Sequence, residues 1–265
     1  MGLSDKRQTL AARMSYLNTK RNTGNIANQK QITIRRAEKS DIDALNRICR
    51  QCFPDNTRWQ VGFLAEKFWN GALELPSSET WIWLANDEAA GFSHIIVDLG
   101  AWAKEKRDLG FGRAARLFAL ATRPRLFLQK IQKRIRLALY ERKGETQTGG
   151  SEMSMMGRAF ECFNQNSLKS PLIHYGGIYA DPSKIIWVER AAVLPHYRKL
   201  GLALQIMRFS EERAKKLGRS AICGVIEAVN EPWRWMHERF GYVITHTKSG
   251  RYTYTKILGG EERQG

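Results

Sequence analysis

Hydrophobic and polar positions along the chain follow two periods, and each period predicts one type of element. Short runs of apolar β-branched and aromatic residues predict strands, whereas apolar residues three and four positions apart predict helices. The first ordered part of the chain is predicted to be strand, helix, helix, strand, strand, at residues 32–35, 40–52, 62–73, 81–85 and 90–97. Ser40 is expected to cap the first helix, and the polar residues between the last two strands predict a hairpin turn.

The second ordered part begins with a strand over residues 187–193, which ends before Pro195 because proline cannot continue a strand ladder. A helix, a strand, a helix and a final pair of strands are predicted at residues 202–217, 220–227, 230–240, 241–245 and 252–258. Gly218 is expected to end the first of these helices. Helices and strands mixed in this way predict an α/β (α+β) fold.

A basic residue and two small residues lie where the strand 187–193 leads into the helix 202–217. They are Arg198, Gly201 and Ala203, in the pattern R-x-x-G-x-A. A helix N-terminus offers unpaired backbone N–H groups and the positive end of the helix dipole, and small residues let a phosphate approach the backbone. This stretch has neither the lysine-serine/threonine pair of a P-loop nor the three glycines of a dinucleotide fold, so it predicts another kind of phosphate site.

Asn230 opens the helix predicted at residues 230–240, and Gly241 and Tyr242 follow its last residue, Phe240. Together with the preceding R-x-x-G-x-A motif, this arrangement resembles the GNAT superfamily of acyl-coenzyme A N-acyltransferases. Shorter similarities lie in the expected order upstream, at residues 40–43 and 90–92. The resemblance covers residues 31–98 and 183–258. It implies the GNAT fold, a mixed central sheet of about six to seven strands flanked by helices.

The resemblance also implies a site for acetyl-CoA as co-substrate, and no metal. The residues at this site would be Ala191, Ala192, Val193, Arg198, Lys199, Leu200, Gly201, Leu202, Ala203 and Asn230. Glu189, on the strand before the motif, would be the general base that accepts the proton of the amine, with Glu227 as the alternative. The family places a tyrosine acid four residues before the second motif's glycine; here that position is His237, and Tyr242 and Tyr175 are the other candidates.

The formal net charge of +17 is concentrated in two segments. Residues 1–30 hold six basic residues and one acidic residue, and residues 104–145 hold thirteen basic and four acidic residues. We therefore expect a basic flexible tail at 1–30, the two halves of the GNAT domain at 31–98 and 183–260, and a basic helical insertion with a loop at 99–182, between the third and fourth strands. Phe127/Leu128, Ile131, Ile135 and Leu139 would form the apolar face of an amphipathic basic helix.

An insertion of this kind is similar to that of bacterial GNATs linked to polysaccharide biosynthesis, which suggests an amino sugar or another small amine as acceptor. The alternatives are an anionic membrane surface or a nucleic acid bound through residues 104–143, a helical cap, a homodimer contact, or a catalytically silent binding module. The N-terminus lacks the apolar core of a secretory signal, and Cys49, Cys52, Cys162 and Cys223 are expected to be free thiols. These features predict a cytoplasmic enzyme, with association at the inner membrane as a variant.

Overall fold

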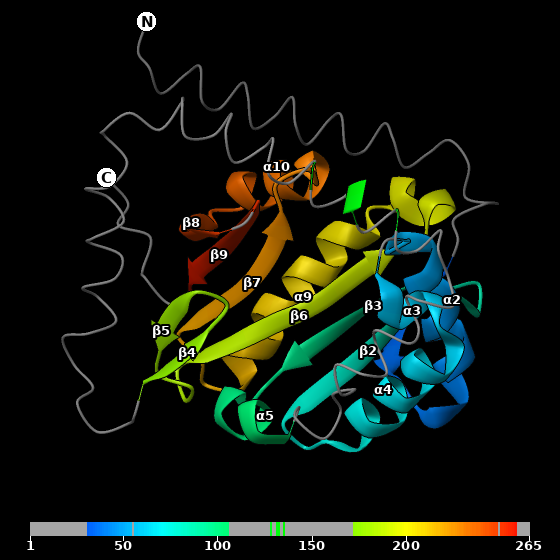
Figure 1. Ribbon diagram of the computed structural model, residues 1–265, viewed down its shortest axis with the longest axis horizontal. Coiled ribbons are helices and arrows are strands. Elements are labelled where there is room, and N and C mark those ends of the chain that lie inside the picture. The colour runs from blue at the N-terminus through cyan, green and yellow to red at the C-terminus, as the bar shows by residue number, and fades with distance from the viewer. Residues whose placement is uncertain are drawn as a thin grey trace, which may run out of the picture.

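The computed structural model describes residues 31–54, 56–105, 172–248 and 250–258, together with Leu128, Ile131, Gln132 and Ile135. A seven-stranded mixed sheet runs through the described part in the order β1-β2-β3-β6-β7-β9-β8. Neighbouring strands are antiparallel except for β6 and β7, which are parallel. Figure 1 shows the sheet with helices on both of its faces. This architecture confirms the α/β fold and the mixed sheet expected from the sequence.

The first half of the domain contains β1 (Ile32–Arg36), α2 (Ile42–Cys52), α3 (Thr57–Gln60), α4 (Gly62–Glu74), β2 (Ser78–Ala85) and β3 (Glu88–Ile96). Its strands and longer helices agree with the prediction, but Ser40 does not cap α2. Asp41 occupies the N-cap position of α2 without making a side-chain capping hydrogen bond. Its carboxylate instead accepts the Glu38 amide at 2.8 Å, at the start of the short 3₁₀ helix η2 (Lys39–Asp41), and both Arg35 Nη atoms at 2.6 and 2.7 Å. A carboxylate satisfies more donors than a hydroxyl, and the guanidinium lowers the pKa of Asp41.

The second half contains β6 (Ile185–Val193), η3 (Pro195–Leu200), α9 (Leu202–Lys216), β7 (Ala221–Glu227), α10 (Glu231–Arg239), β8 (Val243–Lys248) and β9 (Arg251–Ile257). Each predicted element is present. The main difference is η3, a 3₁₀ helix where the sequence predicted only a connection between strand and helix. Gly218 follows α9 with a φ of +66°, the left-handed conformation that commonly ends a helix.

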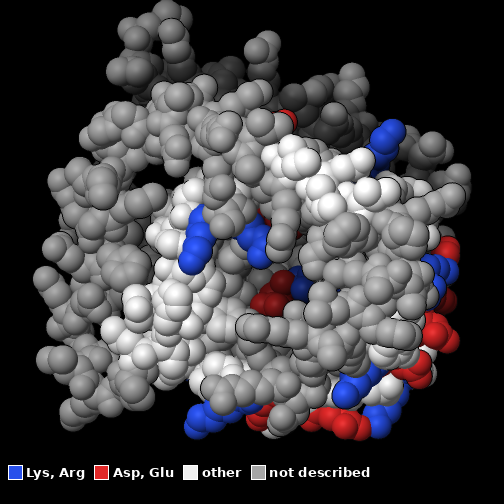
Figure 2. All heavy atoms as spheres, viewed as in Figure 1, with Lys and Arg blue, Asp and Glu red and all other residues white. Residues whose placement is uncertain are grey.

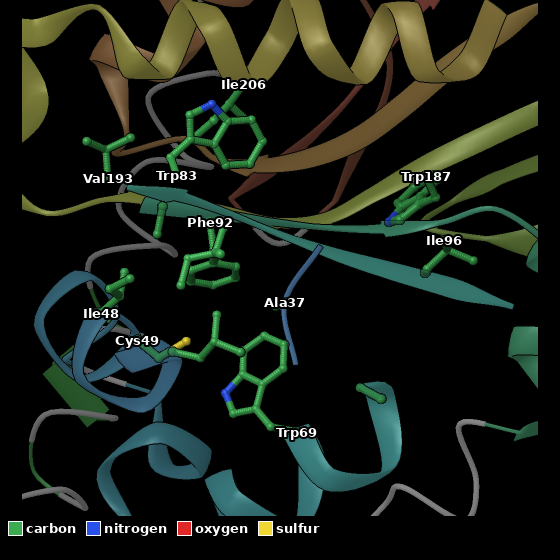
Figure 3. Close-up of a cluster of buried hydrophobic side chains, with 14 of the residues drawn as sticks. Ala37, Ile48, Cys49, Trp69, Trp83, Phe92, Ile96, Trp187, Val193 and Ile206 are labelled. Carbon is green, nitrogen blue, oxygen red and sulfur yellow. The ribbon is translucent and has the colours of Figure 1, made fainter. Parts of the chain in front are cut away.

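Two layers of helices cover the sheet. Figure 3 shows Trp83 and Ile206 between the sheet and α9, and Phe92 and Trp69 on the opposite face, toward α2 and α4. Tryptophan supplies much of the core: Trp59, Trp69, Trp83 and Trp102 are at most 2% exposed. Large rings bury much apolar area per residue, which stabilises a sheet of this size.

Gly91 allows the two central strands β3 and β6 to approach closely. A Cβ atom at this position would lie 2.7 Å from the Ala192 carbonyl oxygen. Since no carbon reaches an oxygen at that distance without backbone movement, glycine fits this register and larger residues do not. The sequence motif at 90–92 therefore has a packing function, since Gly91 lets β3 lie close to β6, the strand predicted to bind acetyl-CoA.

Several described elements lie inside the predicted insertion at 99–182. They are α5 (Leu99–Glu105), whose Trp102 is buried in the core, and a two-stranded hairpin of β4 (Ile173–Tyr175) and β5 (Ile178–Ala180). Leu128, Ile131 and Ile135 are helical and exposed. The tail 1–30, the rest of the predicted basic helix and Cys162 lie outside the described residues. No helix of the described part has the length and hydropathy needed to cross a membrane.

Candidate active site

The central parallel strands β6 and β7 separate partway along their length. They pair from Ile185 with Ala221 as far as Val188 with Gly224, and both strands continue beyond that point without pairing to each other. Figure 1 shows the tips of the two arrows pointing apart. Backbone groups of β6 that face this wedge are left without a strand partner. Such unpaired groups at the carboxyl ends of parallel strands are available to a ligand.

A β-bulge places Glu189 at the start of this wedge. In the ladder between β6 and β3, Val188 pairs with Ile95 and Arg190 pairs with His94, so Glu189 is an extra residue without a partner. An extra residue breaks the alternation of side chains and re-aims them. As a result, both Glu189 and Arg190 contact residues on the face of the sheet that α2, α3 and α4 cover.

Tyr175 holds the Glu189 carboxylate. Its hydroxyl donates to Glu189 Oε2 at 3.0 Å and accepts from Trp102 Nε1 at 3.2 Å. The tyrosine ring packs edge-on against Trp187, with 4.9 Å between the ring centroids. Burial, together with the neighbouring carboxylate, raises the pKa of Tyr175, so the phenol stays protonated and donates to Glu189 at all ordinary pH values.

Arg190, the next residue in the bulge, lies under the α2–α3 segment. Its Cζ atom is 5.0 Å from the centroid of Trp59 and 5.7 Å from that of Phe53. Figure 2 shows a hollow on this face of the molecule in which acidic and basic atoms are recessed together. The bulge thus sets two consecutive charged residues, Glu189 and Arg190, at the start of the wedge.

The predicted phosphate site is built around Gly201. Its φ of +71° is left-handed, and it occupies the N-cap position of α9, where no side chain makes a capping hydrogen bond. Leu204 and Gln205 donate to the Gly201 carbonyl, so the amides of Leu202 and Ala203 precede the first helical hydrogen bonds. Apart from its neighbours in the chain, no heavy atom of the described residues lies within 4 Å of the position of a Gly201 Cβ. Glycine is therefore needed for conformation, and the space beside it is open.

Two basic residues of the motif, Arg198 and Lys199, precede Gly201 in η3. Arg198, Lys199 and Leu200 are exposed in η3, next to the N-terminus of α9. Arg198 Nε donates to the Val193 carbonyl at 3.3 Å, which ties the guanidinium to the end of β6. Val193 O also accepts the Cys52 thiol at 3.5 Å. This carbonyl therefore already has protein donors, whereas Ala191 and Ala192 lie on the part of β6 that has left β7.

The opposite side of the wedge carries Asn230 and Glu227. Asn230 is exposed at the N-cap of α10, and its side chain makes no capping hydrogen bond. An asparagine that leaves a helix N-terminus uncapped has its amide free to meet another group. Glu227 ends β7, and its carboxylate lies 3.8 Å from Arg251 Nη2. The alternative base is thus paired with a cation, whereas the carboxylate of Glu189 is held by a phenol.

His237, on α10, is packed among aromatic side chains. Its Nδ1 is 2.8 Å from the Trp233 carbonyl, so that nitrogen carries the proton and donates. The ring packs against Tyr242 and Tyr254, with centroid distances of 4.7 and 5.4 Å. Burial lowers the pKa of His237, which favours the neutral imidazole. Tyr242 is buried beside the same ring, and burial raises its pKa.

The structure brings together residues that the sequence analysis considered separately. In the sequence Tyr175 was only one of three candidates for the acid, and no pattern paired it with Glu189. The hairpin that carries it went unpredicted, although Gly176 and Gly177 between two short apolar runs are typical of a two-residue hairpin turn. Both glycines have positive φ, and a Cβ on Gly176 would overlap the Trp187 ring. The two glycines could have revealed the hairpin, but not its position over the sheet.

The central strands β6 and β7 of the mixed sheet separate, and an open helix N-terminus lies beside the end of β6. These two features define the class of acyl-coenzyme A-dependent acyltransferases. Residues 162–242 match the model of the acetyltransferase (GNAT) family. This part of the chain therefore matches the GNAT family, and the mixed sheet agrees with that assignment. The matched residues include β6, η3, α9, β7 and α10, which are the elements that form the wedge and the phosphate site. No curated protein matches the chain.

Solved structures of several acetyltransferases are distantly similar. The ribosomal-protein-S18-alanine N-acetyltransferase from Escherichia coli is 11% identical, with a TM-score of 0.47 over 88% of this chain and 98% of that one. The PaiA N-acetyltransferase from Thermoplasma acidophilum in complex with coenzyme A is 9% identical, with a TM-score of 0.47 over 86% and 99%. YncA from Salmonella typhimurium with acetyl-CoA is 13% identical, with a TM-score of 0.45 over 88% and 98%. Similarities at this level carry no argument about the reaction.

Proposed function

We propose that the protein is an N-acetyltransferase that transfers the acetyl group of acetyl-CoA to the primary amine of a small acceptor, an amino sugar or a similar amine. The observation that carries this proposal is the bulge at Glu189. It sets a hydrogen-bonded carboxylate at the point where β6 leaves β7, on the strand that leads to the phosphate site. The carboxylate and the site for the acyl donor therefore share one strand.

Each part of the wedge has a role in this reaction. The amides of Leu202 and Ala203, with Arg198, would hold the pyrophosphate, and the unpaired backbone of β6 and the Asn230 side chain would hold the pantetheine. Acetyl-CoA would supply the acyl group as a thioester. An amine must be neutral to attack, so Glu189 would accept its proton, directly or through water, and Tyr175 would fix the carboxylate in place.

The departing thiolate also needs a proton donor. His237 remains the sequence prediction, but the lowered pKa and the bond from Nδ1 to a backbone carbonyl argue against it, because a neutral imidazole in this tautomer has no proton to give at Nε2. His237→Gln would decide the point. A loss of turnover at unchanged acetyl-CoA affinity would support the acid role, and unchanged turnover would leave protonation to solvent.

Two measurements test the proposed function. Calorimetric titration with acetyl-CoA should show binding that Arg198→Ala weakens; an absence of binding by the wild-type protein would refute the proposal. Glu189→Gln should then lower kcat and leave acetyl-CoA affinity nearly unchanged, since the carboxylate is expected to act on the acceptor. Glu227→Gln is the matched control, and a larger loss with this variant would transfer the base role to Glu227.

We also propose that residues 104–143 bring the enzyme to an anionic membrane surface. Leu128, Ile131 and Ile135 are 57%, 39% and 55% exposed, at the spacing of one helical face, and thirteen basic residues lie in the same part of the sequence. Apolar side chains among many cations match the interface of an anionic bilayer. Cosedimentation with vesicles rich in phosphatidylglycerol should be lost when the three are changed to serine. Val243→Ser, at an equally exposed strand position, is the control.

Vesicle binding that survives the three serine substitutions would refute the membrane assignment. Binding to RNA that competes with vesicles and is unaffected by these substitutions would favour a nucleic acid as the polyanionic partner.

A further inference from the structure

In the part of the chain that the structure describes, Arg190 is a guanidinium without a counter-ion at the candidate active site. Among the described residues no carboxylate lies within ion-pair distance of it, and no hydrogen-bond acceptor meets any of its nitrogens. Nε is sealed from solvent without a partner. Guanidinium groups that are partly buried are normally paired with carboxylates or phosphates, because removing water from an unpaired charge is unfavourable.

Contacts with aromatic rings fix Arg190 but do not satisfy its donors. The guanidinium lies over Trp59, which is fully buried, and beside Phe53 at the end of α2. A ring face attracts the cation but accepts no in-plane N–H bond. Nε is the one nitrogen of Arg190 among the sealed, unpartnered polar atoms, and the residue as a whole is half-buried rather than buried. The Nη donors, which best suit a planar, two-oxygen acceptor, are therefore the ones left for a ligand.

The surroundings add positive potential. Arg58 also lies near Trp59, with its Cζ 5.7 Å from the ring centroid. Both guanidinium groups act in the same sense on the buried His94, which stays neutral. Glu189 is the nearest acid along the strand, but it is bound to the Tyr175 hydroxyl and makes no ion pair with Arg190 in the described structure.

We propose that Arg190 selects an anionic acceptor. The amine substrate carries a carboxylate or phosphate group that binds the Nη atoms of Arg190, while the amine of the same substrate faces Glu189. This inference rests on the proposed function. The bulge makes the arrangement possible, because it turns two consecutive side chains to the same face of the sheet. One side chain then accepts the proton of the amine, and the next binds the anion of the same molecule.

Matched pairs of acceptors test the inference on the wild-type protein. The pairs are β-alanine and its amide, phosphoethanolamine and ethanolamine, and glucosamine 6-phosphate and glucosamine. We expect kcat/KM for the anionic member of at least one pair to be about 10- to 100-fold higher, the range that one or two charge-assisted hydrogen bonds give. The carboxylate and phosphate pairs distinguish the two kinds of anion. Equal or better use of the neutral members in every pair would overturn the inference.

Substitution at Arg190 separates selection from support of the fold. Arg190→Gln should raise KM for the anionic acceptor about 10- to 100-fold and leave the neutral acceptor unchanged. Arg190→Lys should restore part of the preference. Arg36→Gln, an equal change of charge at an exposed position of β1, should have no effect. Equal losses for both members of a pair would mean that Arg190 only stabilises the fold.

A binding measurement covers the case in which none of the six amines is a substrate. Inorganic phosphate and acetate should quench the fluorescence of Trp59, measured as the difference between titrations of the wild-type protein and of Arg190→Gln. Identical titrations of the two proteins would overturn the inference. Calorimetry with acetyl-CoA keeps the two proposals apart. Failure to bind acetyl-CoA refutes the proposed function, whereas normal binding without anion preference refutes only the role of Arg190.

Discussion

His94 makes the folded protein sensitive to acid. Its ring is fully buried, packs within 5.8 Å of the ring centroids of Phe68, Trp69 and Trp102, and makes one hydrogen bond, of 2.9 Å, between Nδ1 and Thr80 Oγ1. The other ring nitrogen is buried without a partner among the described residues. Burial, with the nearby guanidinium groups, lowers the pKa of His94 from 6.5 to about 3.

The direction of the pH effect follows from this shift. The unfolded chain takes up a proton on His94 as the pH falls through 6.5, whereas the folded protein does not do so until about pH 3. The unfolded state is therefore favoured progressively as the pH falls from 6.5 to about 3. The stability that neutral His94 gives the folded protein is fully present only above pH 6.5. At pH 5 the loss is about 2 kcal/mol, since each pKa unit corresponds to about 1.4 kcal/mol.

Urea unfolding followed by tryptophan fluorescence at pH 7 and pH 5 measures this loss. We expect His94→Gln to be less stable at pH 7 but to lose about 2 kcal/mol less than the wild-type protein between the two pH values. His174→Gln, a substitution of an exposed histidine on β4, should keep the wild-type difference. If the wild-type protein and His94→Gln lose the same free energy of unfolding from pH 7 to pH 5, then His94 is not held neutral by burial and the reasoning is refuted.

Three further predictions concern the central strands and the site. Gly91→Ala should destabilise the fold by about 1 to 3 kcal/mol in urea unfolding, because the new Cβ meets a backbone oxygen. Gly62→Ala, where the space is open, should change the free energy of unfolding by less than about 0.5 kcal/mol, and equal effects of the two substitutions would contradict the close approach of the strands. Tyr175→Phe should lower kcat about tenfold, with unchanged acetyl-CoA affinity, because Glu189 loses a hydrogen bond; wild-type turnover would show that the bond is not used. Gly201→Ala should weaken acetyl-CoA binding in calorimetry more than Gly201→Asn, since asparagine tolerates a φ of +71° better than alanine. The reverse order would mean that side-chain size, not backbone conformation, sets the acetyl-CoA affinity at this position.

The sequence by itself determined the strands of the seven-stranded sheet and the longer helices, with their order, because periodicity and turn chemistry act over a few residues. Period-2 and period-3.6 patterns located the strands and helices of the seven-stranded sheet within a few residues of their ends. The turn at Asn86 and Asp87, which have φ values of +52° and +64°, falls at the predicted polar turn. Gly201 lies at the helix start that the R-x-x-G-x-A motif predicts. Each of these features depends on local backbone geometry, which neighbouring residues fix.

Only the tertiary structure decided how the chemistry of the site is arranged. A bulge adds one residue to a ladder, and the pattern of a single strand does not show which residue its partner leaves unpaired, so the shared face of Glu189 and Arg190 was hidden. The hydrogen bond from Tyr175 depends on where a separate hairpin lies on the sheet. The contact of Arg190 with Trp59 joins segments far apart in the chain, and the lack of a counter-ion for Arg190 among the described residues is a property of packing. Contacts between distant segments are set by how whole elements pack, which local sequence rules do not encode.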